Sequence, residues 1–455
     1  MQLRNLNLGS ALVWLSIVDP ACVRAGQGAY ASLVTEYRTF HDQRRRGVES
    51  VERALHAERL DRRALISAVL DRNPSVEAAR QAWRAALERY RQTGAWDEPM
   101  LAASLAPLSL GANKARLGYE VEINQRVPLG GKLDAQAALA AAEAQLAASD
   151  FSEARSKLAL MASDLYDDYV LALRSLEIQA QHVALMRALQ DNTLAGYASG
   201  HTATQDALQA EGELARLEYQ ITAYETQRDL AIARMNALLH RDPGAPLPPP
   251  RAEDPLYDKP EELSADDVAR AVERRPDAHC ARARLAVAHA RAQAADAEYF
   301  PDLTLSASYN SMWDMPEHRF MTGVALSLPL QRERRSAALS EAAALRAASE
   351  SELQSVSDSA QGEIAVARRQ LAGARRAALL YEQRLLPLAR QRIEAARAGF
   401  ITGGNNFMAV IEAERGLRSA ELELEMARAD LRKSQAALER ALGRLPGPSA
   451  EQVTP

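Results

Sequence analysis

The sequence has few aromatic residues and almost no cysteine. Phe, Trp and Tyr make up 5% of the 455 residues although 47% are hydrophobic, and much of that apolar content is alanine. Alanine favours helices and narrow seams between them but fills a globular core poorly, so the composition favours elongated helical packing over a compact enzyme. The two cysteines, Cys22 and Cys280, can form neither a disulfide framework nor a four-ligand zinc site.

Basic charge and catalytic motifs are also missing. The net charge of −5 offers no field that would attract nucleic acid, so no nucleic-acid partner is expected. The chain has no Gly-x-Ser-x-Gly, no His-Glu-x-x-His and no phosphate loop, because Gly131-Lys132 is followed by leucine and lacks the upstream glycine. We therefore expect a protein that is not an enzyme and that needs no cofactor.

The first 25 residues have the features of an export signal. Arg4 precedes an apolar run from Leu6 to Val18 that is too short to span a bilayer. Cys22 is a possible lipid-attachment site, cleavage after Ala25 is an equal alternative, and an amphipathic start to a cytosolic helix is a third interpretation. No later segment is apolar enough for a membrane helix, so any insertion is expected as a β-barrel.

Two stretches that lie 203 residues apart repeat one pattern. Gly196-Tyr197-Ala198-Ser199-Gly200 and Gly399-Phe400-Ile401-Thr402-Gly403 each precede a long helical run. Arg72-Asn73-Pro74 likewise matches Arg274-Arg275-Pro276 at nearly the same offset. A period near 200 is far longer than a solenoid repeat, so each copy is a domain-sized half of the chain.

The duplication predicts a division of the chain into six segments. Each half is expected to contain a short helix, a β-hairpin, a long helix, a tip turn and a second long helix. The Pro-rich stretch between the halves cannot be helical, and the charged residues before the first half are expected to be a solvated arm. The expected segments are a signal at 1–25, the arm at 26–59, a first repeat at 60–241, a linker at 242–263, a second repeat at 264–444 and a tail at 445–455.

The helix signal is strongest after each β region. No glycine or proline occurs from Lys132 to Ala195, and these 64 residues would make a helix roughly 95 Å long. In the second copy a heptad of large residues runs from Val410 to Leu438, with small residues three positions further on. This seam is typical of an antiparallel coiled coil. Gly200 and Gly403 are then expected at the tips of two helical hairpins, where glycine permits a left-handed turn.

Alternating sequences predict the strands. Residues 117–124, 303–310 and 320–328 alternate apolar and polar side chains, and 101–111 is assigned as a fourth strand from the duplication. Strands of about ten residues can cross a bilayer in a tilted barrel, although one alternation alone fits an ordinary soluble hairpin equally well. Four strands cannot close without exposed edges, so chains must share one barrel. Three chains supply twelve strands, the smallest count with room for a lumen, so a trimer is predicted.

The doubled order of helix, strand pair, Pro-Leu, long helix, Gly-aromatic-x-x-Gly and long helix resembles the TolC-like outer membrane factor family. The resemblance covers about Leu60 to Arg444. Two segments, Gln125–Lys132 and Leu385–Pro387, look most like its CzcC-type heavy-metal efflux branch. The resemblance implies a mostly α-helical fold in which duplicated hairpins form a periplasmic α-barrel tunnel on a trimeric 12-stranded outer-membrane β-barrel.

The same resemblance implies a function and its partners. The chain would be the outer-membrane channel of a tripartite efflux system that exports metal cations or other toxic compounds. It would contact outer-membrane lipid, a periplasmic membrane-fusion adaptor and an inner-membrane resistance-nodulation-division pump. The alternatives are a soluble coiled-coil scaffold and the exit duct of a type I secretion system.

Family resemblance also suggests a gate near the hairpin tips. Asp206 and Glu412 fall on acidic positions of the two copies, and Asn405 stands where some members carry an arginine. A hydrogen bond from Asn405 to Asp206 could replace a salt bridge, and a ring of three Glu412 carboxylates would favour cations. The simpler alternative is that both acids are solvated residues favoured by the helix dipole.

One further group of residues suits soft cations. Met312, Met315, His318 and Met321 cluster around the expected turn between the last two strands, and thioethers with imidazole bind such ions. We expect this turn to face the outside of the cell, where a binding site has little use. No metal site is assigned to it.

Overall fold

The structure is a computed structural model that describes residues 27–55, 57–107, 117–198, 204–251, 263–402, 404 and 406–445. The chain forms two compact units. Unit 1 consists of Met1–Thr39, Gln81–Ser149 and Cys280–Gln354, and unit 2 of Phe40–Arg80, Asp150–His279 and Ser355–Pro455. Cys22 lies outside the described residues.

Unit 1 contains the first part of helix α2 (Gln27–Leu55). The sequence predicted a solvated arm at this place, whereas the structure has a helix that packs against other residues. Tyr30 stacks on Tyr90 with ring centroids 4.1 Å apart, and Tyr37 meets Trp83 edge to face at 5.3 Å. Leu33 is buried between these contacts along the sequence. Aromatic and aliphatic residues at positions 30, 33 and 37 share one face of a helix, and the charge of the segment concealed this spacing.

One four-stranded antiparallel sheet makes up the β part of unit 1. Its order is β1-β2-β3-β4, so the strands of the two copies pair through β2 and β3. The strands are β1 (Met100–Leu105), β2 (Tyr119–Pro128), β3 (Asp302–Asn310) and β4 (Phe320–Leu326). The four predicted strands are thus present, including β1, which was inferred from the duplication.

The sheet is joined to the helices of unit 1 by a tight turn and an ion cluster. These helices are α4 (Pro74–Thr93), α8 (Pro276–Ala297) and the first parts of α5 (Lys132–Ala198) and α9 (Arg332–Leu380). Gly130 has a φ of +72°, and a Cβ there would lie 2.1 Å from the Phe300 ring. Asp302 accepts hydrogen bonds from Lys132 and Arg126. The Val-Pro-Leu-Gly-Gly-Lys segment therefore has a structural role in ending β2 and starting α5.

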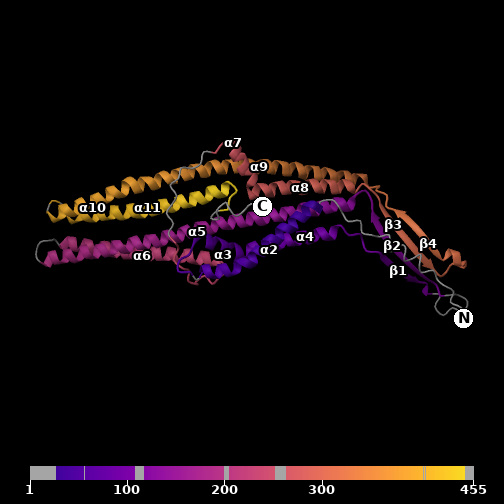
Figure 1. Cartoon of the computed structure of the whole chain (residues 1–455), viewed down its shortest axis with the longest axis horizontal. Coiled ribbons are helices and arrows are strands. Elements are labelled where there is room, and N and C mark those ends of the chain that lie inside the picture. Colours follow the sequence, from indigo (N-terminus) through magenta and orange to yellow (C-terminus); the bar gives the residue numbers. More distant parts are fainter. Residues whose placement is uncertain are drawn as a thin grey trace. The chain divides into compact units, whose positions relative to one another are not determined.

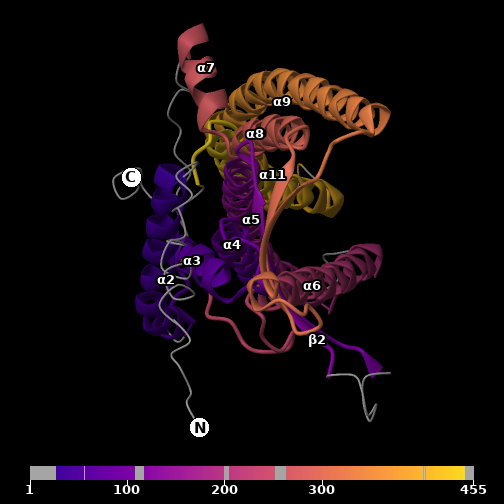
Figure 2. The same ribbon diagram turned by 90° about the vertical axis from the view of Figure 1, so that its right-hand side faces the viewer.

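Unit 2 contains the two long helical hairpins. The remainder of α5 and α6 (Thr204–Leu238) form one antiparallel pair, and α10 (Leu386–Ile401) with α11 (Phe407–Ala441) forms the other (Figure 1). Figure 2 looks along these helices. Both α6 and α11 have 35 residues and begin 203 positions apart, so the duplication is preserved in the helices. The short helices α3 (Arg62–Arg72) and α7 (Ala265–Arg274) also belong to this unit.

The second copy has a break that the first copy lacks. Its long helix passes from α9 through a π-helical turn, Tyr381–Leu385, into α10. The Leu386 amide donates to the Tyr381 carbonyl, five residues earlier. Pro387 has no amide hydrogen and its ring crowds the preceding turn. A π turn accommodates such a defect and commonly marks a place where a helix bends.

The predicted seam of α11 is buried. Val410, Leu424 and Leu431 are at most 5% exposed, and Ala413 and Ala427 are buried as well. Leu417, Ser434 and Leu438 are half-buried. Small side chains at alternate layers let neighbouring helices approach closely. The heptad pattern thus predicted the buried face of this helix correctly.

Each copy begins at a residue that binds the end of the same copy. Asn73 precedes Pro74 and its side-chain amide donates to the Leu238 carbonyl at the end of α6. Arg275 precedes Pro276 and its guanidinium donates to the Ala441 carbonyl at the end of α11, as well as to Asp277 and Glu363. Residues before proline favour extended backbone, which ends the first helix and turns the side chain towards this carbonyl.

We predict that Arg275→Ala destabilises the protein by about 2 to 3 kcal/mol. The Arg275 side chain is 4% exposed and pairs with two carboxylates that are themselves partly exposed, so the loss falls below that of a fully buried pair. Urea unfolding in detergent measures it. Arg274→Ala, at an exposed neighbouring position, is the matched control, and equal stability losses in the two variants would contradict the role assigned to Arg275.

Candidate functional site

The residues predicted to form the gate are only partly described. Gly200, Gly403 and Asn405 lie outside the described residues. Asp206 is half-buried in the first turn of α6, and Glu412 is exposed on α11. Among the described residues, neither carboxylate forms a hydrogen bond or ion pair, so their role in a gate stays a prediction.

An aromatic contact orders the start of α11. Asn406 is the N-cap, and its side chain accepts a hydrogen bond of 3.0 Å from the Ala409 amide. Phe407 is 1% exposed, lies 5.7 Å from the Phe400 ring, and packs in one cluster with Ala210 of α6. The two hairpins of unit 2 therefore contact each other close to their tips. Sequence reasoning missed this contact, although Phe407 extends the apolar seam of α11 by one turn.

A histidine on α5 lies between two carboxylates of α11. The Nδ1 atom of His182 is 2.6 Å from Oε1 of Glu414, and its Nε2 atom is 2.8 Å from Oε2 of Glu421. His182 is 4% exposed and Glu414 is fully buried. The two acids are seven residues apart on α11 and so occupy the same face of the helix.

The charge state of His182 follows from these neighbours. Burial alone would lower the pKa of this imidazole, but its hydrogen bonds and Coulombic attraction to Glu414 and Glu421 together outweigh burial and raise the pKa from 6.5 to about 8. A neutral imidazole donates one hydrogen bond, whereas the imidazolium donates two. Near neutral pH the charged ring therefore satisfies both carboxylates.

A second buried carboxylate joins α6 to α11. Glu213 is 3% exposed and accepts hydrogen bonds from Arg415 at 2.5 Å and from Arg418 at 3.5 Å. Gln179 of α5 donates to Gln220 and to the Leu217 carbonyl of α6 on the same level of the bundle. We call the set made by His182, Glu213, Glu414, Arg415, Arg418 and Glu421 the hairpin charge cluster.

Further from the tips, an aspartate on α5 binds two arginines. Asp167 is fully buried and accepts from Arg62 of α3 at 2.7 Å and from Arg432 of α11 at 2.6 Å. Its neighbour Asp168 pairs with Lys433. Charged contacts therefore join α5 to α11 at two levels.

The sequence contained a signal for this cluster that its interpretation did not use. Glu414 and Glu421 lie between the large residues of the α11 heptad, on its buried side. Each follows a small seam residue, Ala413 or Ala420, by one position, and charged residues that flank a coiled-coil seam commonly pair with a neighbouring helix. Their partner, His182, is 232 and 239 residues away along the chain, and no local pattern could identify it.

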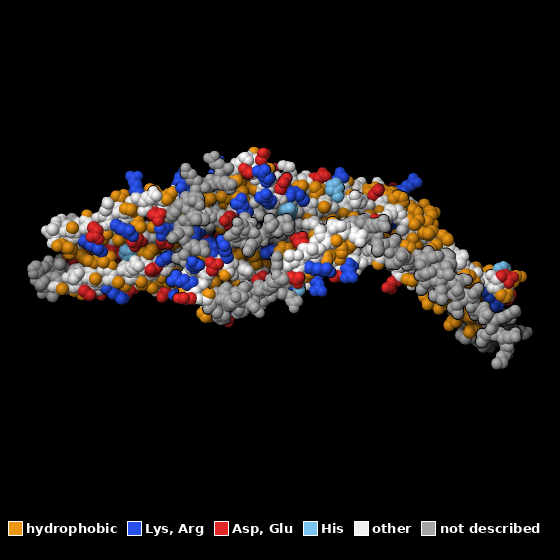
Figure 3. All heavy atoms as spheres, in the orientation of Figure 1, with side chains coloured by type: hydrophobic (Ala, Val, Ile, Leu, Met, Phe, Trp, Pro, Cys, Tyr) orange, Lys and Arg blue, Asp and Glu red, His pale blue; other side chains and the backbone are white. Residues whose placement is uncertain are grey.

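The sheet has one apolar and one polar face. Registered neighbours such as Leu101 and Ile123, Val121 and Tyr309, and Leu305 and Val324 stand on the same side. The other side carries mostly polar residues. Hydrophobic side chains are visible along the strands in Figure 3. The apolar face holds Leu101, Ala103, Leu105, Tyr119, Val121, Ile123, Gln125, Val127, Leu303, Leu305, Ala307, Tyr309, Phe320, Thr322, Val324 and Leu326.

The apolar face is open to solvent in the single chain. Leu101 is 71% exposed and Val324 is 72% exposed. A soluble monomer does not normally leave so large an apolar surface uncovered. Among the helices of the described chain, none combines the length and the apolar character required to cross a membrane.

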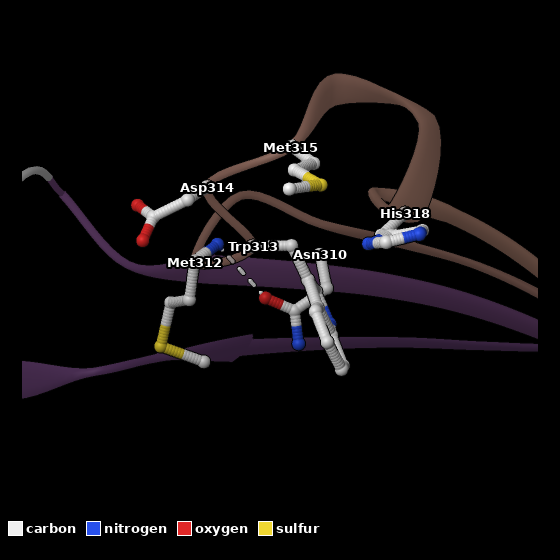
Figure 4. Close-up of a pocket in the computed structure, with 6 residues that line it drawn as sticks. All are labelled: Asn310, Met312, Trp313, Asp314, Met315 and His318. Carbon is white, nitrogen blue, oxygen red and sulfur yellow. Dashed lines mark hydrogen bonds between the residues drawn. The ribbon is translucent and has the colours of Figure 1, made fainter.

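A shallow pocket lies at the turn between β3 and β4, next to the short helix Pro316–His318. Asn310, Met312, Trp313, Asp314, Met315 and His318 line it. In Figure 4 the Met312 thioether points away from Met315 and His318. Met312 instead lies against Gly118, where a Cβ would come within 3.0 Å of its sulfur. The potential metal ligands at this turn therefore do not converge.

Comparison with known proteins gives the class. The model of the family described as outer membrane efflux protein matches twice, at residues 65–240 and 268–444. The two matches together cover more than half of the chain. The chain belongs to the outer membrane efflux protein family. No curated protein matches it.

Three solved structures have the same fold. CusC, which changes conformation as it folds and forms a transmembrane channel, is 20% identical with a TM-score of 0.73, and the alignment covers 84% of this chain and 92% of CusC. The outer membrane protein VceC from Vibrio cholerae is 20% identical with a TM-score of 0.70, over 84% and 95% of the two chains. The MtrE outer membrane channel of Neisseria gonorrhoeae, in its open state, is 19% identical with a TM-score of 0.70, over 84% and 89%.

Family membership establishes the general function. The protein is the outer-membrane component of an efflux system, and it extends from the outer membrane into the periplasm. Members of the family are channel proteins rather than enzymes, and they act as trimers with an adaptor and an inner-membrane pump. The predicted mostly helical fold with four strands is confirmed.

We predict that Glu213→Ala lowers the free energy of unfolding by about 3 kcal/mol. Arg418, 8% exposed, would lose this acceptor while staying buried, and removal of one member of a buried pair is strongly destabilising. Thermal unfolding of the purified protein measures the change. Glu211→Ala, at an exposed position on the same helix, is the control and should change stability by less than about 0.5 kcal/mol. If Glu211→Ala destabilised the protein as much as Glu213→Ala, the loss would not come from the buried ion pair.

Proposed function

We propose that three copies of this chain form the exit channel of a tripartite efflux system of the resistance-nodulation-division type. The observation that carries the proposal is the two-faced sheet with two free edges. In the described chain β1 pairs with β2 alone and β4 with β3 alone, so each outer edge has unpaired amides and carbonyls. Three chains joined edge to edge would satisfy them in one closed sheet of twelve strands.

The two faces of the sheet suit two different solvents. Closure of the sheet would place the apolar face, which includes Val121 and Leu305, against lipid. The polar face, with Glu120, Glu122 and Ser306, would line the lumen. A soluble coiled-coil scaffold would have no use for such a sheet, and family membership also disfavours that alternative.

The exported substrate is proposed to be a metal cation. The support is the resemblance of Gln125–Lys132 and Leu385–Pro387 to the heavy-metal branch of the family. In the structure these segments form the strand-to-helix junction and the π turn, so their proposed role is to shape the channel rather than to bind the metal. Selection of the substrate would then belong to the pump. The periplasmic tips of the hairpins, near Gly200 and Gly403, would dock the adaptor.

Adjacent residues of β4 test membrane insertion and trimer formation. Val324 stands on the apolar face and Ala325 on the polar face. A lysine on a lipid-facing strand costs about 2 to 4 kcal/mol at the middle of the bilayer and little in the lumen. Val324→Lys should therefore reduce the cross-linked trimer in outer-membrane fractions at least several-fold, and Ala325→Lys should leave it nearly unchanged. Equal amounts of trimer in both variants, or monomers alone in the wild type, would reject the proposal.

The acidic gate is tested by ion selectivity. If three Glu412 carboxylates surround the periplasmic mouth, they concentrate cations there. Glu412→Gln should lower the cation preference in planar-bilayer recordings, and Glu412→Lys should shift it further towards anions. The difference should be largest in 0.01 M salt, where the Debye length is roughly 30 Å. Unchanged selectivity would place Glu412 outside the conduction path. Asp206→Ala with Asn405→Ala should raise conductance if these residues brace the closed tip.

A substrate test uses the cell. Deletion of the gene should sensitise cells to particular metal cations, and the wild-type chain should restore resistance. If resistance to organic toxic compounds changes and resistance to metals does not, the channel proposal stands but the metal substrate is wrong.

A further inference from the structure

The imidazole of His182 is the titratable group that joins α5 to α11 within the hairpin charge cluster. Each ring nitrogen faces one carboxylate, at 2.6 Å for Glu414 and 2.8 Å for Glu421. Both contacts are full hydrogen bonds when the ring carries two protons. With one proton, one nitrogen must turn its lone pair towards a carboxylate oxygen, and the attraction becomes a repulsion.

Glu414 depends strongly on this partner. Its side chain is fully buried, and its Oε1 accepts from His182 while Oε2 has no hydrogen-bond partner among the described residues. A buried carboxylate with one hydrogen-bond donor is costly to keep charged once that donor is lost. Loss of the second proton leaves His182 at most one of its two hydrogen bonds and removes the positive charge opposite Glu414. The contact between the helices is therefore weaker when the histidine is neutral.

Other charges around His182 are already paired or lie further away. On α11, Arg415 and Arg418 bind Glu213 of α6. On α10, Arg390 lies 3.8 Å from Glu421 and is 63% exposed. The neighbouring polar groups of α5 and α6 are amides, Gln179 and Gln220. None of these groups donates a hydrogen bond to Glu414 in the structure, whose Oε1 faces His182.

The position of His182 relates it to the hairpin tips. It lies sixteen residues before the end of α5 and Glu414 seven residues after the start of α11, which corresponds to about 24 Å and 10 Å along the helices. The π turn Tyr381–Leu385 leads into α10, the partner helix of this end of α11. Arg428 of α11 binds Glu382 in that turn. The part of the second hairpin between the π turn and the tip is thus the part that His182 holds.

We propose that His182 is a proton-dependent latch, which holds the tip of the α10–α11 hairpin against α5 and releases it when the imidazole loses its proton. The inference rests on the proposed function, in which these tips close the periplasmic mouth. His182 acts here as a positioning residue, because it sets the separation of two helices without itself touching the exported substrate.

The direction of the pH effect follows from the two states of the histidine. Its pKa is 6.5 in the unfolded chain and about 8 in the folded one, so the latch contributes its full stabilisation below about pH 6.5 and loses it as the pH rises through 8. Roughly nine tenths of the histidine is charged at pH 7 and roughly one tenth at pH 9. We therefore expect a closed tip at neutral pH and a looser one at alkaline pH.

Two substitutions separate charge from shape. His182→Gln keeps a polar side chain but no charge, so the channel should be open several-fold more often than wild type at pH 7, with little change up to pH 9. His182→Arg keeps a charge and several donors at every pH, so it should stay closed at pH 9. The wild type should behave like His182→Arg at pH 7 and like His182→Gln at pH 9. His289→Gln, at an exposed position of unit 1, is the control and should follow the wild type.

Hydrogen exchange of the detergent-solubilised protein tests the latch without any conduction. After correction for the intrinsic rate, exchange in 407–424 should rise several-fold between pH 7 and 9 in the wild type and stay constant in His182→Arg. A wild-type profile that matches His182→Arg would overturn the latch. If the latch titrates in this assay but no trimeric channel conducts, the proposed function fails and the latch stands. If the trimer conducts and His182→Gln keeps the wild-type pH profile, the latch fails and the function stands.

Discussion

Buried ion pairs between alanine-rich helices are the constraint on which this structure depends. Alanine seams let helices approach closely, but they bury little apolar surface for each turn. Charges such as Glu213, Asp167 and Glu414 lie in the space between the hairpins, each with a basic partner from another helix. A pair of this kind adds modest net stability, yet loss of one partner is expensive. It therefore fixes which helix faces which.

The sheet differs from the helices because its surfaces are not covered within one chain. Its strands bury little apolar surface within one chain, and among the described residues its apolar side and both outer edges have no partner. The charges inside the bundle determine which helices face each other. In the sheet, the alternation of two faces along every strand determines how the strands pair. The two halves of the duplicated unit share the sheet through β2 and β3, so neither copy could form it alone.

The two copies have helices of nearly equal length but different side chains at equivalent positions. Asn73 and Arg275 occupy equivalent positions and bind equivalent carbonyls with different side chains. Glu213 has Gly416 as its counterpart in the second copy, and the π turn occurs in the second copy alone among the described residues. These differences make the second hairpin the one with a break in its backbone and a titratable contact to its neighbour.

The sequence by itself determined the elements that depend on local periodicity. It predicted α5 as a helix of 64 residues, close to the 67 observed, because glycine and proline are missing there. It also predicted the seam of α11, the four strands and the doubled order, because side-chain periods of 3.5 and 2 are properties of neighbouring residues. Tertiary structure decided which charges are buried. It placed Glu414 inside and Glu412 outside, although they are two residues apart, and it packed α2 against Tyr90 and Trp83. Such contacts join residues that are tens to hundreds of positions apart, and only the folded chain brings them within reach of one another.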